Sequence, residues 1–169
     1  MSETNESRTL LHPLGAYLGG DGVSEVRWMG HTRTRFLATG TSTNGQFCLV
    51  DETAQRGEAI PLHRHSEDVE SFYVTEGEMT FYIEDRRGVT VGAGAFVHVP
   101  AGTVHGFRIA SDSARYLILT TPRHGEFYRA ISVPAGPDGL PDSHDVDWNK
   151  VLEISKSFGI ELVGELPEV

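Results

Sequence analysis

The chain has 169 residues, a formal net charge of −10 at pH 7 from 24 acidic and 14 basic side chains, and one cysteine, Cys48. The length suits one domain with its own hydrophobic core. The acidic balance argues against a nucleic-acid partner, because clustered Lys and Arg supply most of the affinity for phosphate backbones. A single cysteine excludes an internal disulfide, and we interpret Cys48 as a small buried apolar side chain.

The first 22 residues, 1–22, are expected to form an N-terminal arm that precedes the regular strands. Residues 1–8 lack the basic region and the apolar segment of a secretory signal. No apolar run is long enough to cross a bilayer. We therefore predict a soluble protein in the cytoplasm, with no membrane partner.

Residues 23–121 are predicted to form roughly eight to ten short strands, because turn signals recur about every eight to twelve residues. The segment 31–39 is expected to be a strand with one solvent-exposed polar face. Residues 71–75 and 79–84 are predicted to pair as a hairpin. No helix is expected within this region, so the pattern indicates an antiparallel sandwich or barrel.

The C-terminal part, residues 122–169, is predicted to be an extension that packs on the barrel. Residues 126–130 are expected to form a short helix. A longer helix is predicted over residues 147–158, with Asp145 or Asp147 as its N-cap and a glycine just after its end.

A candidate metal site lies within the predicted barrel, residues 23–121. His63 and His65 are two residues apart, so their imidazoles project from the same face of an extended segment. Glu70 adds a carboxylate shortly afterwards, and His105 follows a later Pro-x-Gly turn. Imidazole with carboxylate suits Fe, Mn, Ni, Co, Cu or Zn better than Mg or Ca. We expect one such divalent transition metal per chain.

Two spaced motifs around these residues resemble those of the cupin superfamily. The first motif, with the spacing Gly-x5-His-x-His-x4-Glu-x6-Gly, is matched by Gly57, His63, His65, Glu70 and Gly77. The second, with the spacing Gly-x5-Pro-x-Gly-x2-His, is matched by Gly94, Pro100, Gly102 and His105. Ile109 stands where the family has Asn, a structural position that leaves the ligand set intact. The resemblance covers roughly residues 46–121.

This resemblance implies an all-β fold, a double-stranded β-helix or jelly roll whose two sheets enclose a metal pocket. It implies that His63, His65 and His105 hold the metal as neutral imidazoles, with Glu70 as the fourth ligand. The flanking segments are most similar to those of single-domain, quercetin 2,3-dioxygenase-like cupins. The resemblance, together with the open strand edges of a small barrel, also favours a homodimer.

The preferred functional hypothesis is a metal-dependent oxidoreductase, a dioxygenase that takes a small phenolic or enolic substrate and dioxygen. Similarity to flavonol-cleaving cupins implies that Glu70 is catalytic and accepts the acidic proton of the substrate. One alternative is a non-redox isomerase, decarboxylase or polyketide-type cyclase that uses the same metal. Another is a small-molecule-binding cupin without turnover. No Gly-x-Ser-x-Gly elbow or Gly-rich phosphate loop supports other enzyme classes.

Side chains near the ligands are candidates for the substrate pocket. Phe72 lies two residues after Glu70 and Phe107 two after His105, so strand alternation predicts both on the ligand face. His98 alternates with two valines and is a further candidate for the pocket. Five phenylalanines in predicted strands are expected to pack in the core: Phe47, Phe72, Phe81, Phe96 and Phe107. Four histidines outside the motifs are given no role: His12, His31, His124 and His144.

Overall fold

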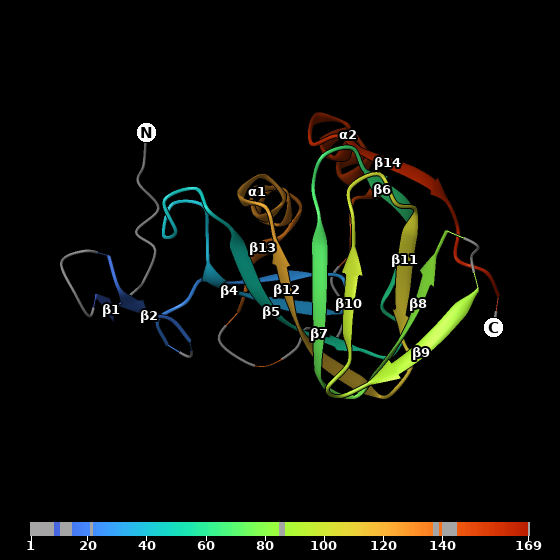
Figure 1. The fold of residues 1–169 in the computed structure, drawn as a ribbon, viewed down its shortest axis with the longest axis horizontal. Helices are drawn as coiled ribbons and strands as arrows, with labels where there is room; N and C mark the ends of the chain where they lie inside the picture. Colours follow the sequence, from blue (N-terminus) through green and yellow to red (C-terminus); the bar gives the residue numbers. More distant parts are fainter. Residues whose placement is uncertain are drawn as a thin grey trace.

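The computed structural model of the chain describes residues 9–10, 15–20, 22–84, 87–136, 139 and 145–168. Two antiparallel sheets face one another and form a β-barrel with a common interior (Figure 1). The predicted all-β jelly-roll fold is confirmed. The predicted N-terminal arm falls largely outside the described residues, and within it β1 (Thr9–Leu10) pairs with β2 (Tyr17–Leu18).

The larger sheet has seven strands in the spatial order β10-β7-β12-β5-β4-β3-β13. Its strands are β3 (Val26–Met29), β4 (Thr32–Ala38), β5 (Cys48–Gln55), β7 (Glu70–Glu76), β10 (Phe96–Val99), β12 (Ser113–Thr120) and β13 (Val133–Pro134). The smaller sheet has the order β14-β6-β11-β8-β9. Its strands are β6 (Ala59–His65), β8 (Glu78–Ile83), β9 (Gly88–Gly92), β11 (His105–Ile109) and β14 (Ile160–Gly164).

Alternate side chains of both sheets fill the barrel interior with aromatic and branched residues. The ring of Phe72 lies 5.1 Å from that of Phe81 and 5.6 Å from that of Phe107, so the two sheets meet through aromatic edges. Phe47 and Phe96 are not in the core, contrary to the sequence prediction, and are 38% and 65% exposed. Phe96 faces outward from an edge strand, and Phe47 lies just before β5 begins.

Strand β4 has no solvent-exposed polar face, which corrects the expectation for residues 31–39. Thr32, Thr34 and Arg35 are all buried, because β4 is an inner strand between β3 and β5. Arg35 donates a hydrogen bond to Asp51 across the β4/β5 pair, which offsets the cost of burying its charge. The two threonines line a cavity inside the barrel.

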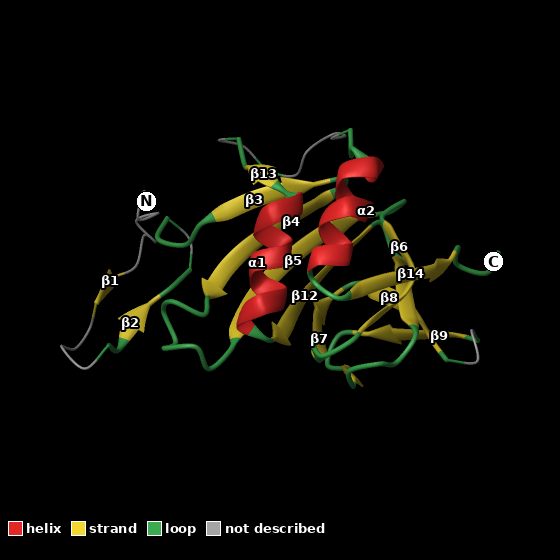
Figure 2. Cartoon of the chain, turned by 90° about the horizontal axis from the view of Figure 1, so that it is seen from above, coloured by secondary structure: helices red, strands yellow, loops and turns green. Residues whose placement is uncertain are grey.

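Two helices lie side by side across one end of the barrel (Figure 2). Helix α1 spans Pro122–Ile131, beginning four residues earlier than predicted. Thr121 caps it, because its Oγ1 accepts a hydrogen bond of 3.1 Å from the backbone N–H of His124. Helix α2 spans Trp148–Ser157 as expected, with Asp147 as its N-cap. No helix in the described part of the chain has the length and apolar character to cross a membrane.

After α2 the chain returns to the smaller sheet as β14, a strand that the sequence reasoning did not predict. β14 pairs with β6, where Leu162 lies opposite His63 and Ile160 opposite His65. The strand that carries two candidate ligands is therefore an inner strand, flanked by β14 and β11, rather than an open edge.

Candidate metal centre

Two adjacent strands of the smaller sheet and one strand of the larger sheet bring the four predicted ligands together. His63 and His65 lie on β6, Glu70 begins β7, and His105 begins β11. His63 and His105 are directly opposite each other in the β6/β11 pair. One ligand atom from each of the four residues lies within 4.8 Å of the others, so the cluster could hold one metal ion. The His63 and His105 rings are 4.3 Å apart between centroids.

Backbone carbonyl groups orient two of the three imidazoles. Nδ1 of His63 lies 2.8 Å from the carbonyl oxygen of Pro61, and Nδ1 of His105 lies 2.9 Å from that of Thr103. A carbonyl oxygen only accepts, so each Nδ1 carries the proton and donates. Nε2 of each ring is then the nitrogen available to a metal, the arrangement that outer hydrogen bonds impose on ligating histidines.

His65 provides a direct test of whether the site suits a metal. Its side chain is 1% exposed, and neither ring nitrogen has a hydrogen-bond partner among the described residues. Nε2 lies 3.5 Å from Oε2 of Glu70. An unpaired buried nitrogen costs stability, and coordination would satisfy it. Together with two oriented imidazoles and a carboxylate, this donor set fits a divalent transition metal.

Burial keeps two of the imidazoles neutral at physiological pH. It lowers the pKa of His63 to about 4 and that of His65 to about 3. Burial opposes the charge on His105 as well, but the hydrogen bond with Glu70, the Glu70 charge and the hydrogen bond to Thr103 together outweigh burial and raise the pKa of His105. Burial also disfavours the Glu70 carboxylate, yet the neighbouring His124 and His105 lower the pKa of Glu70 well below its ordinary value. The site thus holds an ionised carboxylate among imidazoles.

Besides His105, whose Nε2 lies 2.8 Å from Oε2, the Glu70 carboxylate has two partners that the sequence did not predict, His124 and Tyr128. Its Oε1 lies 3.1 Å from Nε2 of His124 and accepts a 2.5 Å hydrogen bond from the hydroxyl of Tyr128. His124 and Tyr128 are four residues apart on α1, so they share one helix face. The spacing of four residues could have indicated this shared face, but the predicted helix, residues 126–130, did not include His124.

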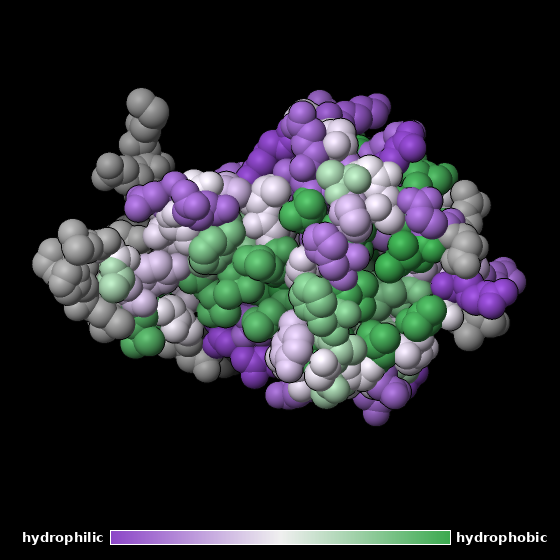
Figure 3. Space-filling view, viewed as in Figure 1, coloured by the Kyte–Doolittle hydropathy of each residue, from purple (hydrophilic) through white to green (hydrophobic). Residues whose placement is uncertain are grey.

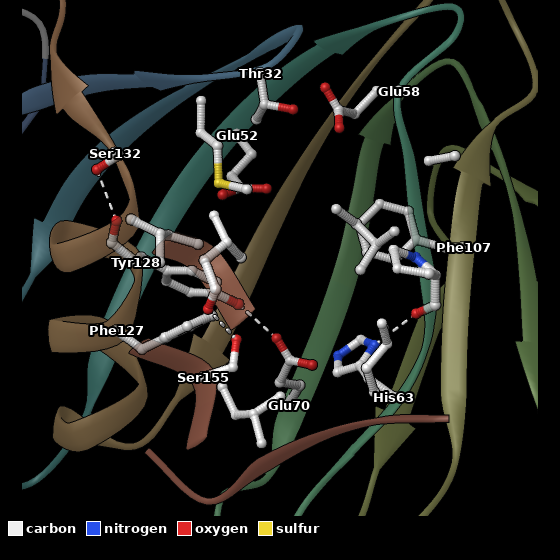
Figure 4. Close-up of a pocket in the computed structure, with 18 of the residues that line it drawn as sticks. Thr32, Glu52, Glu58, His63, Glu70, Phe107, Phe127, Tyr128, Ser132 and Ser155 are labelled. Carbon is white, nitrogen blue, oxygen red and sulfur yellow. Dashed lines mark hydrogen bonds between the residues drawn. The ribbon is translucent and has the colours of Figure 1, made fainter. Parts of the chain in front are cut away.

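A cavity of about 680 Å³ extends from the ligand cluster into the barrel. Figure 4 shows His63 and Glu70 along one side of it and Glu52, Thr32 and Glu58 along the other. The volume is within the range of small-molecule sites. Its lining includes side chains from both sheets and both helices, among them Phe107, Ile118, Phe127, Tyr128, Val151 and Leu152.

A family model described as a cupin domain matches residues 50–120, which contain all four candidate ligands. These residues form a cupin domain. The chain is also similar to quercetin 2,3-dioxygenase from Bacillus subtilis (strain 168), with 35% identity over 101 residues. That match covers 59% of this chain and 30% of the relative, so the chain spans less than a third of the relative's length.

Solved cupin structures share the fold. An RmlC-like cupin from Shewanella frigidimarina NCIMB 400 has 17% identity and a TM-score of 0.57, over 72% of this chain and 98% of that one. The polyketide cyclase RemF from Streptomyces resistomycificus has 21% identity and a TM-score of 0.53, over 73% of this chain and 80% of that one. At these identities the likeness concerns the fold alone.

Of the three predicted pocket residues, the structure places one in the cavity. Phe107 lines it. Phe72 is fully buried in the aromatic core and does not line the cavity, because Phe81 and Phe107 pack against its ring. His98 is exposed on the edge strand β10, where its Nδ1 lies 2.8 Å from Oγ of Ser71. The side chains of β10 alternate, and that of His98 points away from the interior.

A second group of possible ligands adjoins the first and shares His65 with it. It consists of His65, Asp68 and His124, all buried and with ligand atoms within 4.8 Å of one another. Asp68 already accepts hydrogen bonds from Thr121 at 2.6 Å and from Arg123 at 3.1 Å. Its carboxylate therefore anchors the start of α1.

Proposed function

We propose that this chain is a metal-dependent dioxygenase that acts on a small phenolic or enolic substrate. The observation that carries the proposal is the convergence of His63, His65, His105 and Glu70 beside a cavity large enough for such a molecule. Similarity to a quercetin 2,3-dioxygenase supports the reaction class. Phenols with an acidic hydroxyl group are therefore the proposed substrate class.

In this proposal, three imidazoles and Glu70 hold a single divalent transition metal. When bound, such a metal would lower the pKa of substrate hydroxyl groups, and a redox-active one, which excludes Zn, would also supply redox chemistry with dioxygen. Its identity among Fe, Mn, Ni, Co, Cu and Zn depends on supply and geometry as well as ligand type.

Glu70 is the proposed catalytic base. Its carboxylate lines the cavity, is ionised and has its Oε1 held by Tyr128 and His124. The two helical side chains fix the carboxylate plane, so a proton accepted from the substrate hydroxyl arrives at a defined position. The apolar lining, with Phe107 and Ile118, excludes water and orients the substrate ring.

Oxygen uptake by metal-loaded protein with quercetin tests the proposal, followed by simpler phenols and 1,3-diketones. We expect uptake that requires both substrate and metal, and a loss of at least about 100-fold in Glu70→Gln. Glu76→Gln is the matched control, because Glu76 lies on the same strand and its side chain is 71% exposed. Substrate conversion without oxygen uptake would instead identify a non-redox isomerase, decarboxylase or cyclase.

A homodimer is also proposed, and it is supported by an apolar strip on the outer face of the larger sheet (Figure 3). The strip consists of Leu49, Tyr73, Phe96, Leu117 and Leu119. Leu49 lies opposite Leu119, and Tyr73 lies opposite both Phe96 and Leu117, so these residues adjoin across four strands. A second copy of the chain would bury this strip.

We also propose a cytoplasmic location, because a chain with one cysteine, Cys48, cannot form the internal disulfides that are common in oxidising compartments. The acidic net charge of −10 supports a small-molecule substrate rather than a nucleic-acid partner.

A further inference from the structure

A second carboxyl group, that of Glu52, lies inside the barrel away from the metal ligands. On β5 the inward-facing row is Cys48, Val50, Glu52 and Ala54, so one carboxyl group interrupts three small apolar side chains. Glu52 is 7% exposed and lines the cavity. Figure 4 shows it on the side opposite Glu70. A carboxyl group in a core row costs stability unless it is neutral or paired, so its presence needs a reason.

The partners of Glu52 are neutral hydroxyl groups. Thr34 lies opposite Glu52 on β4, and Tyr116 lies opposite it on β12. The Thr34 hydroxyl donates a 2.8 Å hydrogen bond to Oε1 of Glu52, and the Tyr116 hydroxyl also bonds to the carboxyl group. No Lys or Arg among the described residues forms an ion pair with Glu52. Its charge is thus not compensated.

Other titratable groups around the cavity are mostly acidic or neutral. Those lining it with Glu52 are Glu58, His63, Glu70, Arg108, Tyr116, His124, Tyr128 and Glu165. Burial raises the pKa of Glu52 to about 7, an effect that the Thr34 and Tyr116 hydrogen bonds oppose and the charges of Glu70 and Glu58 increase. Near neutral pH, Glu52 therefore holds a proton for much of the time.

We propose that Glu52 is a second catalytic residue, which donates its carboxyl proton to an oxygen atom of a substrate bound in the cavity. The O–H bond of Glu52 breaks as a bond from that proton to the substrate oxygen forms. The Thr34 and Tyr116 hydroxyls then stabilise the carboxylate that remains. Glu52 recovers a proton from product or water after each cycle, so the residue ends unchanged. This inference rests on the proposed use of the cavity as the substrate site.

The arrangement also narrows the substrate class. A hydroxyl group that gives up a proton would face Glu70, and a carbonyl, ether or hydroxyl oxygen that receives one would face Glu52. The two carboxyl groups are on opposite sides of one cavity, so the two oxygens belong to different parts of the substrate. An uncharged phenol or enol with a second oxygen function meets this requirement. A carboxylate at the Glu52 end would be repelled by Glu58.

The protonation state of Glu52 can be measured without any turnover. In protein with ¹³C-labelled Glu side chains, the Glu52 carboxyl resonance is assigned by its loss in Glu52→Gln. We expect its titration midpoint near 7, as the buried environment dictates. The exposed Glu76 provides the reference in the same spectra. A midpoint near the ordinary value of 4.5 would overturn the inference, whatever the activity.

Kinetics with quercetin and the metal-loaded protein tests the proton transfer itself. Glu52→Gln keeps a hydrogen-bond donor but cannot transfer a proton, so kcat should fall about 100-fold with little change in KM. Glu76→Gln should leave both constants unchanged. A kcat for Glu52→Gln within about threefold of wild type would overturn the inference. If wild-type protein leaves quercetin and oxygen unchanged, the proposed function fails and the catalytic role of Glu52 fails with it, whereas the titration midpoint still shows whether Glu52 is protonated near neutral pH.

Discussion

The hydroxyl of Tyr128 donates a 2.5 Å hydrogen bond to Oε1 of Glu70. This contact joins helix α1 to the strand that carries the proposed catalytic carboxylate. His124 approaches the same oxygen, and its ring lies 4.5 Å from that of Tyr128. Helix α1 therefore positions Glu70, a candidate metal ligand on strand β7 of the barrel.

Removing this hydroxyl should weaken the metal site. In Tyr128→Phe, Glu70 loses one donor and its carboxylate becomes less constrained, so metal affinity should fall about 10-fold or more. Competition with a chromophoric chelator measures the affinity. Tyr82→Phe is the control, because Tyr82 is also buried but lies on β8 outside the cavity lining. Equal affinities for the two variants would remove Tyr128 from the support of Glu70.

Glu52 should make stability depend on pH with a defined sign. The pKa of Glu52 is about 7 in the folded protein and takes its ordinary value of 4.5 in the unfolded chain. Between these pH values the folded state therefore binds more protons than the unfolded state. The contribution of Glu52 to the stability of the folded state is fully present below pH 4.5 and is lost as pH rises through 7. Glu52→Gln cannot titrate.

The free energy of unfolding of wild type, minus that of Glu52→Gln, should therefore fall by up to about 3 kcal/mol between about pH 4.5 and pH 8. Urea unfolding of both metal-free proteins at several pH values measures the difference. A difference that is constant across this range would show that Glu52 titrates normally.

Gly125 should not accept even a methyl group. A Cβ atom at this position would lie 2.4 Å from Sγ of Cys48, so α1 packs against β5 at a point where only glycine fits. Gly125→Ala gains helix propensity of about 1 kcal/mol, yet the overlap should cost more and lower stability by about 1 to 3 kcal/mol.

Thermal unfolding measures this loss, and chelator competition should show weaker metal binding, since α1 carries His124 and Tyr128. The double variant Cys48→Ala/Gly125→Ala removes the sulfur that the new methyl group would overlap. It should therefore recover part of the lost stability and part of the lost metal binding. A Gly125→Ala protein as stable as wild type would contradict the close packing of α1 on β5.

The proposed dimer depends on the apolar strip. Leu119→Glu places a charge in the strip, opposite Leu49 and on the same face of β12 as Leu117, and the cost of burying it should yield monomers at micromolar concentration. Light scattering coupled to size exclusion gives the mass. Val89→Glu, at an exposed site on β9, should leave the dimer intact. A wild-type protein that is already monomeric would contradict the proposal.

The sequence was sufficient to predict the fold and the four candidate ligands, because both depend on local patterns. Turn residues at short intervals indicate strands, and His63 and His65 share a face through simple alternation. The fixed spacing of His, Glu and Gly residues indicated the cupin domain that residues 50–120 match. Helix α2 was predicted as well, since Asp147 and Gly159 flank one apolar face.

Features that depend on tertiary contacts could not be predicted in this way. His124 contacts Glu70 only because α1 begins at Pro122 and packs over the end of the barrel. Glu52 looks like an ordinary strand residue until Thr34 and Tyr116 are placed opposite it. His98 and Phe72 had the expected alternation, but one faces solvent from an edge strand and the other faces the aromatic core.

Metal stoichiometry is the most direct test of the central claim that this barrel is a metal-dependent enzyme. Purified wild-type protein, titrated with Fe, Mn, Co, Ni, Cu or Zn and then desalted, should retain about one ion per chain by elemental analysis. His98→Ala should retain the same amount, because His98 lies outside the site. His105→Ala, which removes one of the four clustered ligands, should retain little. Wild-type protein that retains none of these metals would contradict the account.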